Sequence, residues 1–145
     1  MTHRQRRKSG KRWGATSVEF ALVAPAMLAI IFVAFEFSRI SMMRALAQSA
    51  AYEACRAAIV EGATYDETVE EAERILSRLG TENAVITVND GEEITATTQT
   101  VHVLIEIPME DNSFFFSSYF TGRYVTSEIT LKTERYTGYF DSENL

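Results

Sequence analysis

The sequence offers few side chains that could perform catalysis. Its two imidazoles are His3 and His102, and its single thiol is Cys55. His3 lies in a strongly basic N-terminal segment, and His102 lies in an alternating apolar pattern typical of a β-strand. No phosphate-binding loop, dinucleotide fingerprint, nucleophile elbow or metalloprotease motif occurs. The sequence therefore predicts no enzyme, no metal site and no cofactor.

Cys55 allows two interpretations. A lone cysteine cannot form a disulfide within its own chain, and no Cys/His metal spacing exists. The residue could be a small packing residue of a helix, or it could form an intermolecular disulfide if it faces an oxidising compartment. Neither interpretation implies catalysis.

Glu19 is the charged residue whose position most needs an explanation. It stands immediately before the uncharged run Phe20–Phe35. A carboxylate drawn to the bilayer centre costs about 2.5–3.5 kcal/mol, so a carboxylate that enters a membrane is a functional-site hypothesis by default. The alternative is that Glu19 stays at the interface with water. Gly14 stands five residues before Glu19, in the string GATSVEF.

The uncharged run predicts a membrane span. Sixteen residues cover roughly 24 Å as a helix. A bilayer core needs about 20 residues, so we expect the span to include flanking residues and to run from about 18 to 37. The first fourteen residues, which we interpret as a basic leader, contain six Lys and Arg and no acid. Because positive charge stays inside, the N-terminus is predicted to be cytoplasmic and the C-terminal domain extracytoplasmic.

The rest of the chain is acidic. Residues 15–145 hold eight Lys and Arg against twenty Asp and Glu. Such a domain has no electrostatic reason to seek nucleic acid. The basic leader alone could bind nucleic acid, but its place before an apolar run favours a role in membrane orientation, so the predicted partner is membrane lipid.

Beyond the span, small and apolar residues recur at intervals of three and four as far as Ala58. We therefore expect one long helix from about Thr16 to Val60, within a helical segment 15–62 that Gly62 ends. Its outer half is rich in alanine, which favours helix and close packing. Pro25 removes a hydrogen bond to the carbonyl of Ala21, which predicts a kink or a loosened turn.

Residues 63–145 are predicted to form an α+β domain. Thr64 and Glu67 make a capping box before an acidic helix that ends at about Leu79 and is closed by Gly80. Three strands are expected at 84–88, 100–107 and 124–136, with turn chemistry at 89–91. They should pair antiparallel and pack on the outer half of the long helix.

Residues 111–120, DNSFFFSSYF, place four phenylalanines and a tyrosine between two predicted strands. Such a cluster usually packs under a loop and seals a small core. The alternative is an exposed apolar patch, which would indicate a partner or a lipid contact.

Three segments resemble one known family. They are VEFALVAPAMLAIIFVAF, the string FEFSR and the alanine-rich AQSAAYEACRAA. Together they resemble the TadE-like minor pilins, or pseudopilins, of tight adherence pilus and secretion systems. Ser38 replaces a glycine of that pattern, and Tyr52 and Cys55 depart from its alanine-rich segment. The resemblance covers about the first 60 residues.

The resemblance implies a type IV pilin-like fold and a set of site residues. It places a prepilin-type processing site at Gly14, Ala15 and Glu19, where a peptidase cuts after Gly14 and the new amine pairs with a neighbouring subunit's carboxylate. Subunit docking would involve Glu19, Phe20, Pro25, Glu36 and Arg39. Glu36 and Arg39 are three residues apart, so they can also form an ordinary ion pair on one helix face. The implied partners are other pilins, pilus assembly proteins and the peptidase, at the inner membrane.

Two other interpretations stay open. The chain could be an unprocessed single-pass anchor whose extracytoplasmic domain binds or tethers another component. Alternatively, the string Ala45-Leu46-Ala47 could serve as a signal-peptidase site and release a soluble domain. That string lies beyond Arg39 and Arg44, where such a site is not normally found.

Overall fold

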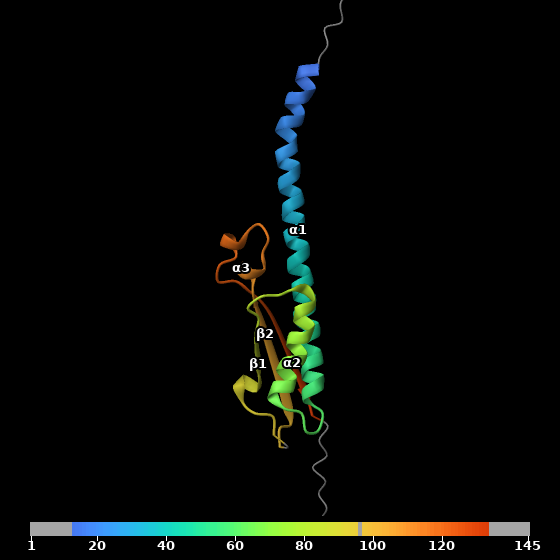
Figure 1. Cartoon of the computed structure of the whole chain (residues 1–145), viewed down its shortest axis with the longest axis vertical. Helices are drawn as coiled ribbons and strands as arrows, with labels where there is room; N and C mark the ends of the chain where they lie inside the picture. Colours follow the sequence, from blue (N-terminus) through green and yellow to red (C-terminus); the bar gives the residue numbers. More distant parts are fainter. Residues whose placement is uncertain (1–12, 96, 134–145) are drawn as a thin grey trace, which may run out of the picture. The chain divides into compact units, whose positions relative to one another are not determined.

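The computed structural model describes residues 13–95 and 97–133 (Figure 1). The chain divides into two compact units, residues 1–35 and 36–145, and we describe each by itself. The predicted leader 1–14 falls almost wholly outside the described residues, as does the segment after 133.

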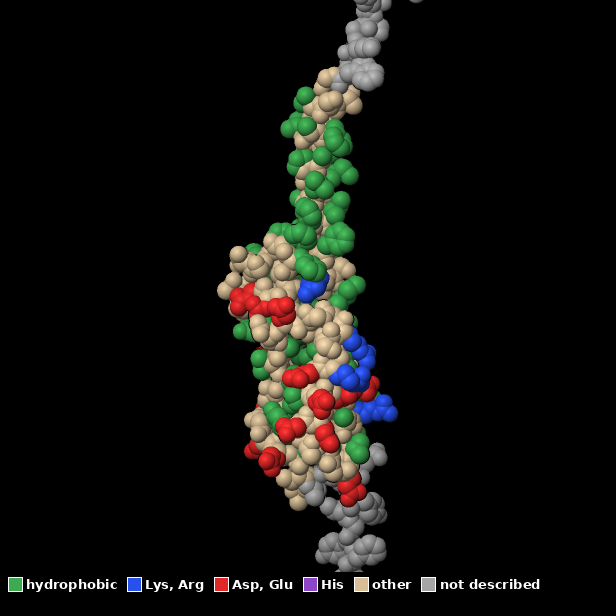
Figure 2. Space-filling view, viewed as in Figure 1, with side chains coloured by type: hydrophobic (Ala, Val, Ile, Leu, Met, Phe, Trp, Pro, Cys, Tyr) green, Lys and Arg blue, Asp and Glu red, His purple; other side chains and the backbone are tan. Residues whose placement is uncertain are grey.

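In the first unit the described residues are all helical. They belong to α1 (Trp13–Ala58), which contains Pro25 and continues on both sides of it. The large apolar side chains here are exposed: Val18, Phe20, Leu22, Val23, Met27, Leu28, Ile30, Ile31, Phe32, Val33 and Phe35. Figure 2 shows apolar side chains, in green, along the visible face of this part of α1. Among the described residues, α1 is the one helix long and apolar enough to cross a membrane.

The second unit joins the remainder of α1 to two further α-helices, three short 3-10 turns and a sheet. In chain order these elements are α2 (Tyr65–Leu76), η1 (Ser77–Leu79), β1 (Val85–Val88), η2 (Asn89–Gly91), β2 (Thr100–Pro108), α3 (Met109–Asn112), η3 (Ser117–Tyr119) and β3 (Tyr124–Lys132). This arrangement confirms the predicted α+β, pilin-like fold with a long apolar helix, a shorter helix and a small antiparallel sheet.

The sheet has the order β1-β2-β3, and both pairings are antiparallel. Val103 at the centre of β2 lies opposite Val88 of β1 and Ile129 of β3. Along β2 the buried residues alternate with partly exposed ones, as a sheet with one covered face requires.

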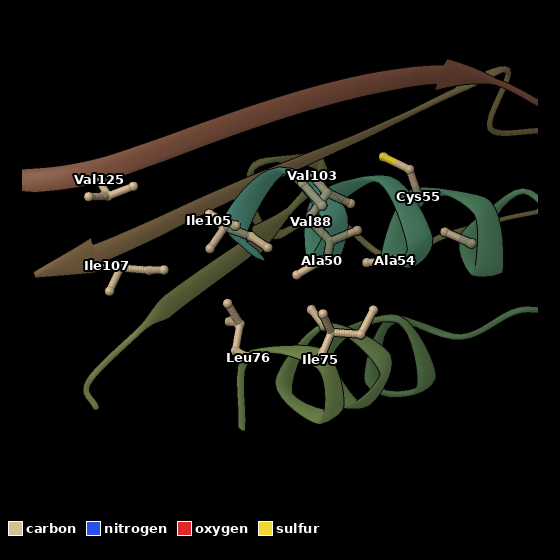
Figure 3. Packing of buried hydrophobic residues seen from close by; sticks show 14 of the residues in the cluster. Ala50, Ala54, Cys55, Ile75, Leu76, Val88, Val103, Ile105, Ile107 and Val125 are labelled. Carbon is tan, nitrogen blue, oxygen red and sulfur yellow. The ribbon is translucent and has the colours of Figure 1, made fainter. Parts of the chain in front are cut away.

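The core forms where this covered face meets α1 and α2 (Figure 3). The strands contribute Val88, Val101, Val103, Ile105, Ile107 and Val125, all buried. Opposite them, α1 contributes Met43, Ala47, Ala50, Ala51, Ala54, Cys55 and Ala58, and α2 contributes Ala72, Ile75 and Leu76. The alanine side chains let the α1 backbone approach the branched side chains of the sheet closely. The expected packing of the sheet on the outer half of the long helix is therefore confirmed.

The ends of α2 follow the local signals in the sequence. The side chain of Thr64 accepts a hydrogen bond from the N–H of Glu67, and the Glu67 carboxylate accepts one from the N–H of Thr64. Gly80 takes the left-handed conformation, with φ of 61°, after η1. The predicted capping box and the predicted glycine stop are both confirmed.

Several boundaries differ from the expectations. Helix α1 ends at Ala58, two residues before the expected Val60, and it already includes Trp13, the first described residue, three residues before the expected Thr16. The turn at Asn89–Gly91 forms with positive φ at all three residues, but the connection from β1 to β2 runs from 89 to 99 and is no tight hairpin. Strand β3 ends at Lys132, and the last residues of the predicted strand lie outside the described part of the chain.

Candidate functional site

Glu36 is the most unusual charged residue of the second unit. It follows Phe35, the last residue of the uncharged run, yet its side chain is only 3% exposed. Its Oε2 atom accepts hydrogen bonds from the backbone N–H groups of Phe114, at 3.2 Å, and Phe115, at 3.4 Å. Its Oε1 atom is buried without a hydrogen-bond partner among the described residues. A buried carboxylate held by two amide donors is an anchor between helix and loop.

Arg39 contacts the same loop. Its Nε atom donates a hydrogen bond to the backbone carbonyl of Asn112. Its guanidinium carbon lies 4.1 Å from the centre of the Phe114 ring, close enough for a cation–π contact. The ion pairs recorded in the described residues do not include Glu36 with Arg39. The helix-face pair that the spacing allows is thus replaced by separate contacts of each side chain with the loop, because the loop supplies both donors and acceptors.

Asn112 fixes the start of this loop, and sequence reasoning missed it. The residue is 1% exposed, and its side-chain amide donates to the carbonyls of Pro108, at 2.8 Å, and Glu82, at 2.9 Å. Its Oδ1 atom accepts from the N–H of Glu82 at 2.9 Å. These bonds tie the chain after β2 to the segment before β1. The only sequence signal was an asparagine shortly after a proline, which does not predict a partner thirty residues away.

The residues that follow form the aromatic loop, which we define as Ser113–Phe120. The side chains of Phe114, Phe115 and Tyr119 are 66%, 52% and 68% exposed. The expectation that this cluster would seal a small core is therefore wrong, and the alternative of an exposed patch holds. The backbone of the loop is secured by Glu36 and Asn112, so its rings are held outward on an anchored scaffold.

The predicted processing residues lie in the first turns of α1. Gly14 has open space where a Cβ would stand, and the side chains of Glu19 and Phe20 are exposed. Ala15 is helical, and its side chain lies outside the described set. The structure thus places Glu19, Phe20 and Pro25 in the first unit, whereas Glu36 and Arg39 belong to the second.

Cys55 is a packing residue of the core. It is fully buried, and its thiol donates to the carbonyl of Ile129 at 3.2 Å. Burial raises the pKa of this thiol from 9.0 to about 11. A buried thiol that keeps its proton is a poor nucleophile and a poor partner for an intermolecular disulfide. The packing interpretation of Cys55 is confirmed.

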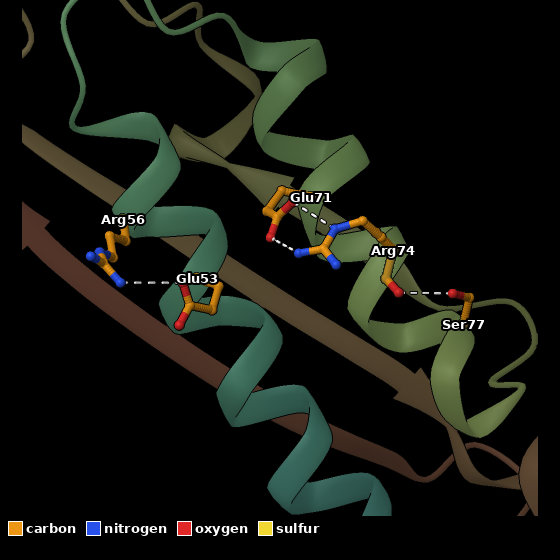
Figure 4. Close-up of polar contacts among 5 residues, drawn as sticks. All are labelled: Glu53, Arg56, Glu71, Arg74 and Ser77. Carbon is orange, nitrogen blue, oxygen red and sulfur yellow. Dashed lines mark hydrogen bonds and ion pairs between the residues drawn. The ribbon is translucent and has the colours of Figure 1, made fainter.

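Other charged residues form ordinary surface contacts. Figure 4 shows Glu53 with Arg56 at 3.9 Å and Glu71 with Arg74, whose side-chain hydrogen bond lowers the pKa of Glu71. Exposed pairs of this kind contribute about 0–1 kcal/mol.

His102 lies on β2 with Nε2 3.0 Å from Glu128 on the neighbouring strand. No group of three or more His, Cys, Asp or Glu in the described ranges is placed to hold a metal ion. His3 lies outside those ranges.

Comparison with known proteins finds a family likeness in the N-terminal part of the chain. Residues 14–56 match the model of the family described as TadE-like protein. This match confirms the family resemblance predicted from the sequence, over α1 and none of the sheet. A search of the curated proteins and a search of the solved structures found no match to this chain.

Proposed function

We propose that this chain is a minor pilin, or pseudopilin, of a tight adherence pilus or a related secretion apparatus. The TadE-like match suggests a protein associated with a Tad pilus, and the family is structural rather than enzymatic. The single apolar helix at the N-terminus suggests anchoring in a membrane. The specific role as an assembly subunit is our inference from these facts together with the surface of α1.

The observation that carries the proposal is the exposure of apolar side chains around α1 before Glu36. None of the most apolar stretch of this helix is buried within the chain. Contiguous apolar surface of this extent needs a lipid or protein partner. In an inner membrane it would be covered by lipid, and in an assembled filament by the helices of other pilins.

Glu19 would guide the transfer of α1 from lipid to the helices of other pilins. In the proposed course, a prepilin-type peptidase cuts after Gly14, and the new amine of Ala15 pairs with the Glu19 carboxylate of a neighbouring subunit. A carboxylate in an apolar setting is tolerated when a cation meets it, and removing either partner is costly. The family match begins at Gly14, which supports this placement of the processing site.

The docking residues divide between two roles in this proposal. Glu19, Phe20 and Pro25 lie on the apolar part of α1, where a neighbouring helix would pack. Glu36 and Arg39 hold the aromatic loop, so they would contribute to docking by keeping that loop in place. With the basic leader on the cytoplasmic side, the second unit would be extracytoplasmic.

The test compares the native chain with Gly14→Ala and with the control Thr16→Ala, expressed with the pilus genes of its own host. The Cβ of Gly14→Ala meets no atom within 4 Å, so the substitution leaves α1 undisturbed. Intact mass and N-terminal sequencing of the membrane fraction should find a mature chain beginning at Ala15 in the native form and the control. The Gly14→Ala chain should stay uncut.

Two results would overturn the proposal. An uncut terminus in all three chains would leave a permanent membrane anchor with a binding or tethering domain. A terminus after Ala47 would indicate release of a soluble domain. Ala47 is fully buried in the core, and cleavage after it would remove Met43 from the same core, so we do not expect this product.

A further inference from the structure

The aromatic loop is bound to α1 at Glu36 and Arg39, just after the uncharged run of the helix ends. The uncharged run ends at Phe35, and the next residue, Glu36, binds the N–H groups of two loop residues. Arg39, one turn further along, binds the carbonyl that precedes the loop. The loop backbone is therefore fixed beside the turn of helix where the apolar segment gives way to the polar one.

The exposed side chains of the loop are aromatic. Phe114, Phe115 and Tyr119 are more than half exposed, although the buried carboxylate of Glu36 accepts hydrogen bonds from the backbone N–H groups of Phe114 and Phe115. Trp and Tyr are enriched where a membrane meets water, because each combines an apolar ring with a polar group, and Phe side chains of interfacial segments enter the same layer. We propose that the aromatic loop inserts into the outer interfacial layer of the membrane that α1 enters, as a lipid contact additional to that of α1.

Charges near the rings fit an interfacial position. Arg39 lies over the ring of Phe114, and Arg123 lies 5.1 Å from the centre of the Tyr119 ring. Cationic side chains at this depth attract lipid phosphates. The nearby acids Glu110 and Asp111 precede the loop, and Asp111 accepts a hydrogen bond from the Asn83 side chain at 2.9 Å. The cations thus flank the aromatic rings, while Asp111 is bound to the segment before β1.

The position of Glu36, which binds the loop directly after the uncharged run, favours lipid over a second copy of the chain as the partner of the loop. A patch that docks a protein can lie on any face of a domain, whereas this loop is tied to the residue that ends the uncharged run. The inference rests on α1 entering a membrane and is independent of processing after Gly14. A contact with another copy of the chain is the competing outcome of the test.

The experiment uses the full chain in vesicles of phosphatidylcholine and phosphatidylglycerol. The single native tryptophan is removed by Trp13→Phe, and a reporter is introduced by Phe115→Trp. The control is Tyr52→Trp, at a side chain 49% exposed on the alanine-rich part of α1. Lipids with bromine near the carbonyl end of the acyl chains quench tryptophan that reaches the interface.

The reporter from Phe115→Trp should be quenched several-fold more strongly than that from Tyr52→Trp, with its emission shifted to the blue. Equal quenching of both reporters would overturn the proposal. A blue shift without lipid quenching, growing as the ratio of protein to lipid rises, would assign the loop to protein contact and also overturn it. Phe116→Trp gives an independent second position if Phe115→Trp fails to fold.

Discussion

Both parts of α1 carry apolar side chains, but these side chains are placed differently. Before Glu36 the helix carries large side chains such as Phe20, Leu22 and Ile30, all exposed. After it the buried positions are mostly alanines, which pack against the valines and isoleucines of the sheet. Side-chain size separates the two parts: small residues allow a backbone to approach a sheet, and large ones offer surface to lipid or to other helices.

This difference teaches that apolar side chains can serve two purposes along one helix, according to their size. The alanine-rich part completes a core within the chain, whereas none of the most apolar stretch before Glu36 is buried within the chain. Glu36 marks the boundary, and its carboxylate is used within the chain to hold the aromatic loop.

The largest effect should come from opening a cavity in the core. Ile105→Ala removes a buried side chain at the centre of β2, and such truncations cost about 2–5 kcal/mol. Leu22→Ala, at a side chain 74% exposed, is the matched control on the other part of α1. Urea unfolding of the full chain in detergent should show the loss for Ile105→Ala alone. Equal losses for both variants would contradict the division of α1.

A smaller effect should follow from removing the anchor of the aromatic loop. Glu36→Ala leaves the N–H groups of Phe114 and Phe115 without their acceptor, at a cost of about 1–3 kcal/mol. Amide hydrogen exchange at these two residues should accelerate, while exchange in β2 stays unchanged. Glu36→Gln keeps a side-chain oxygen as acceptor and should show a weaker acceleration. Unchanged exchange in Glu36→Ala would show that the carboxylate does not hold the loop.

The smallest effect concerns the buried thiol. Because burial raises the pKa of Cys55 from 9.0 to about 11, the native state keeps the thiol proton to higher pH than the unfolded chain does. The contribution of this group to stability is therefore constant below pH 9.0 and falls as the pH rises toward about 11.

Comparison of the native chain with Cys55→Ala isolates this contribution. The free energy of unfolding of the native chain should fall more steeply above pH 9.0 than that of the variant. Alkylation by iodoacetamide at neutral pH should be much slower in the native state than in urea. Parallel pH profiles together with fast native alkylation would place the thiol outside the core.

The elements that the sequence predicts well are those fixed by local chemistry. The capping box of Thr64 and Glu67 and the stop at Gly80 require only neighbouring residues, and the alternation in β2 requires only one covered face. The family motifs likewise lie within one helix. Each of these signals depends only on residues within a few helical turns or within one strand.

The candidate site was less predictable because its contacts are distant in sequence. Glu36 meets amides 78 and 79 residues away, and no local pattern marks a carboxylate that will accept them. The spacing of Glu36 and Arg39 allows an ion pair on one helix face, but the loop binds each of the two side chains separately. The exposure of the aromatic cluster also depended on where the buried bonds of Asn112 place the loop.

The central claim is that the part of α1 before Glu36 meets lipid or other subunits, while the alanine-rich part meets the chain's own sheet. The most direct test is nuclear magnetic resonance of the unmodified full chain in nanodiscs that contain spin-labelled lipid. We expect the amide signals of residues 20–35 to be broadened by the lipid-borne radical and those of residues 47–58 to be unaffected. Equal broadening along the whole of α1, or none in residues 20–35, would contradict the account.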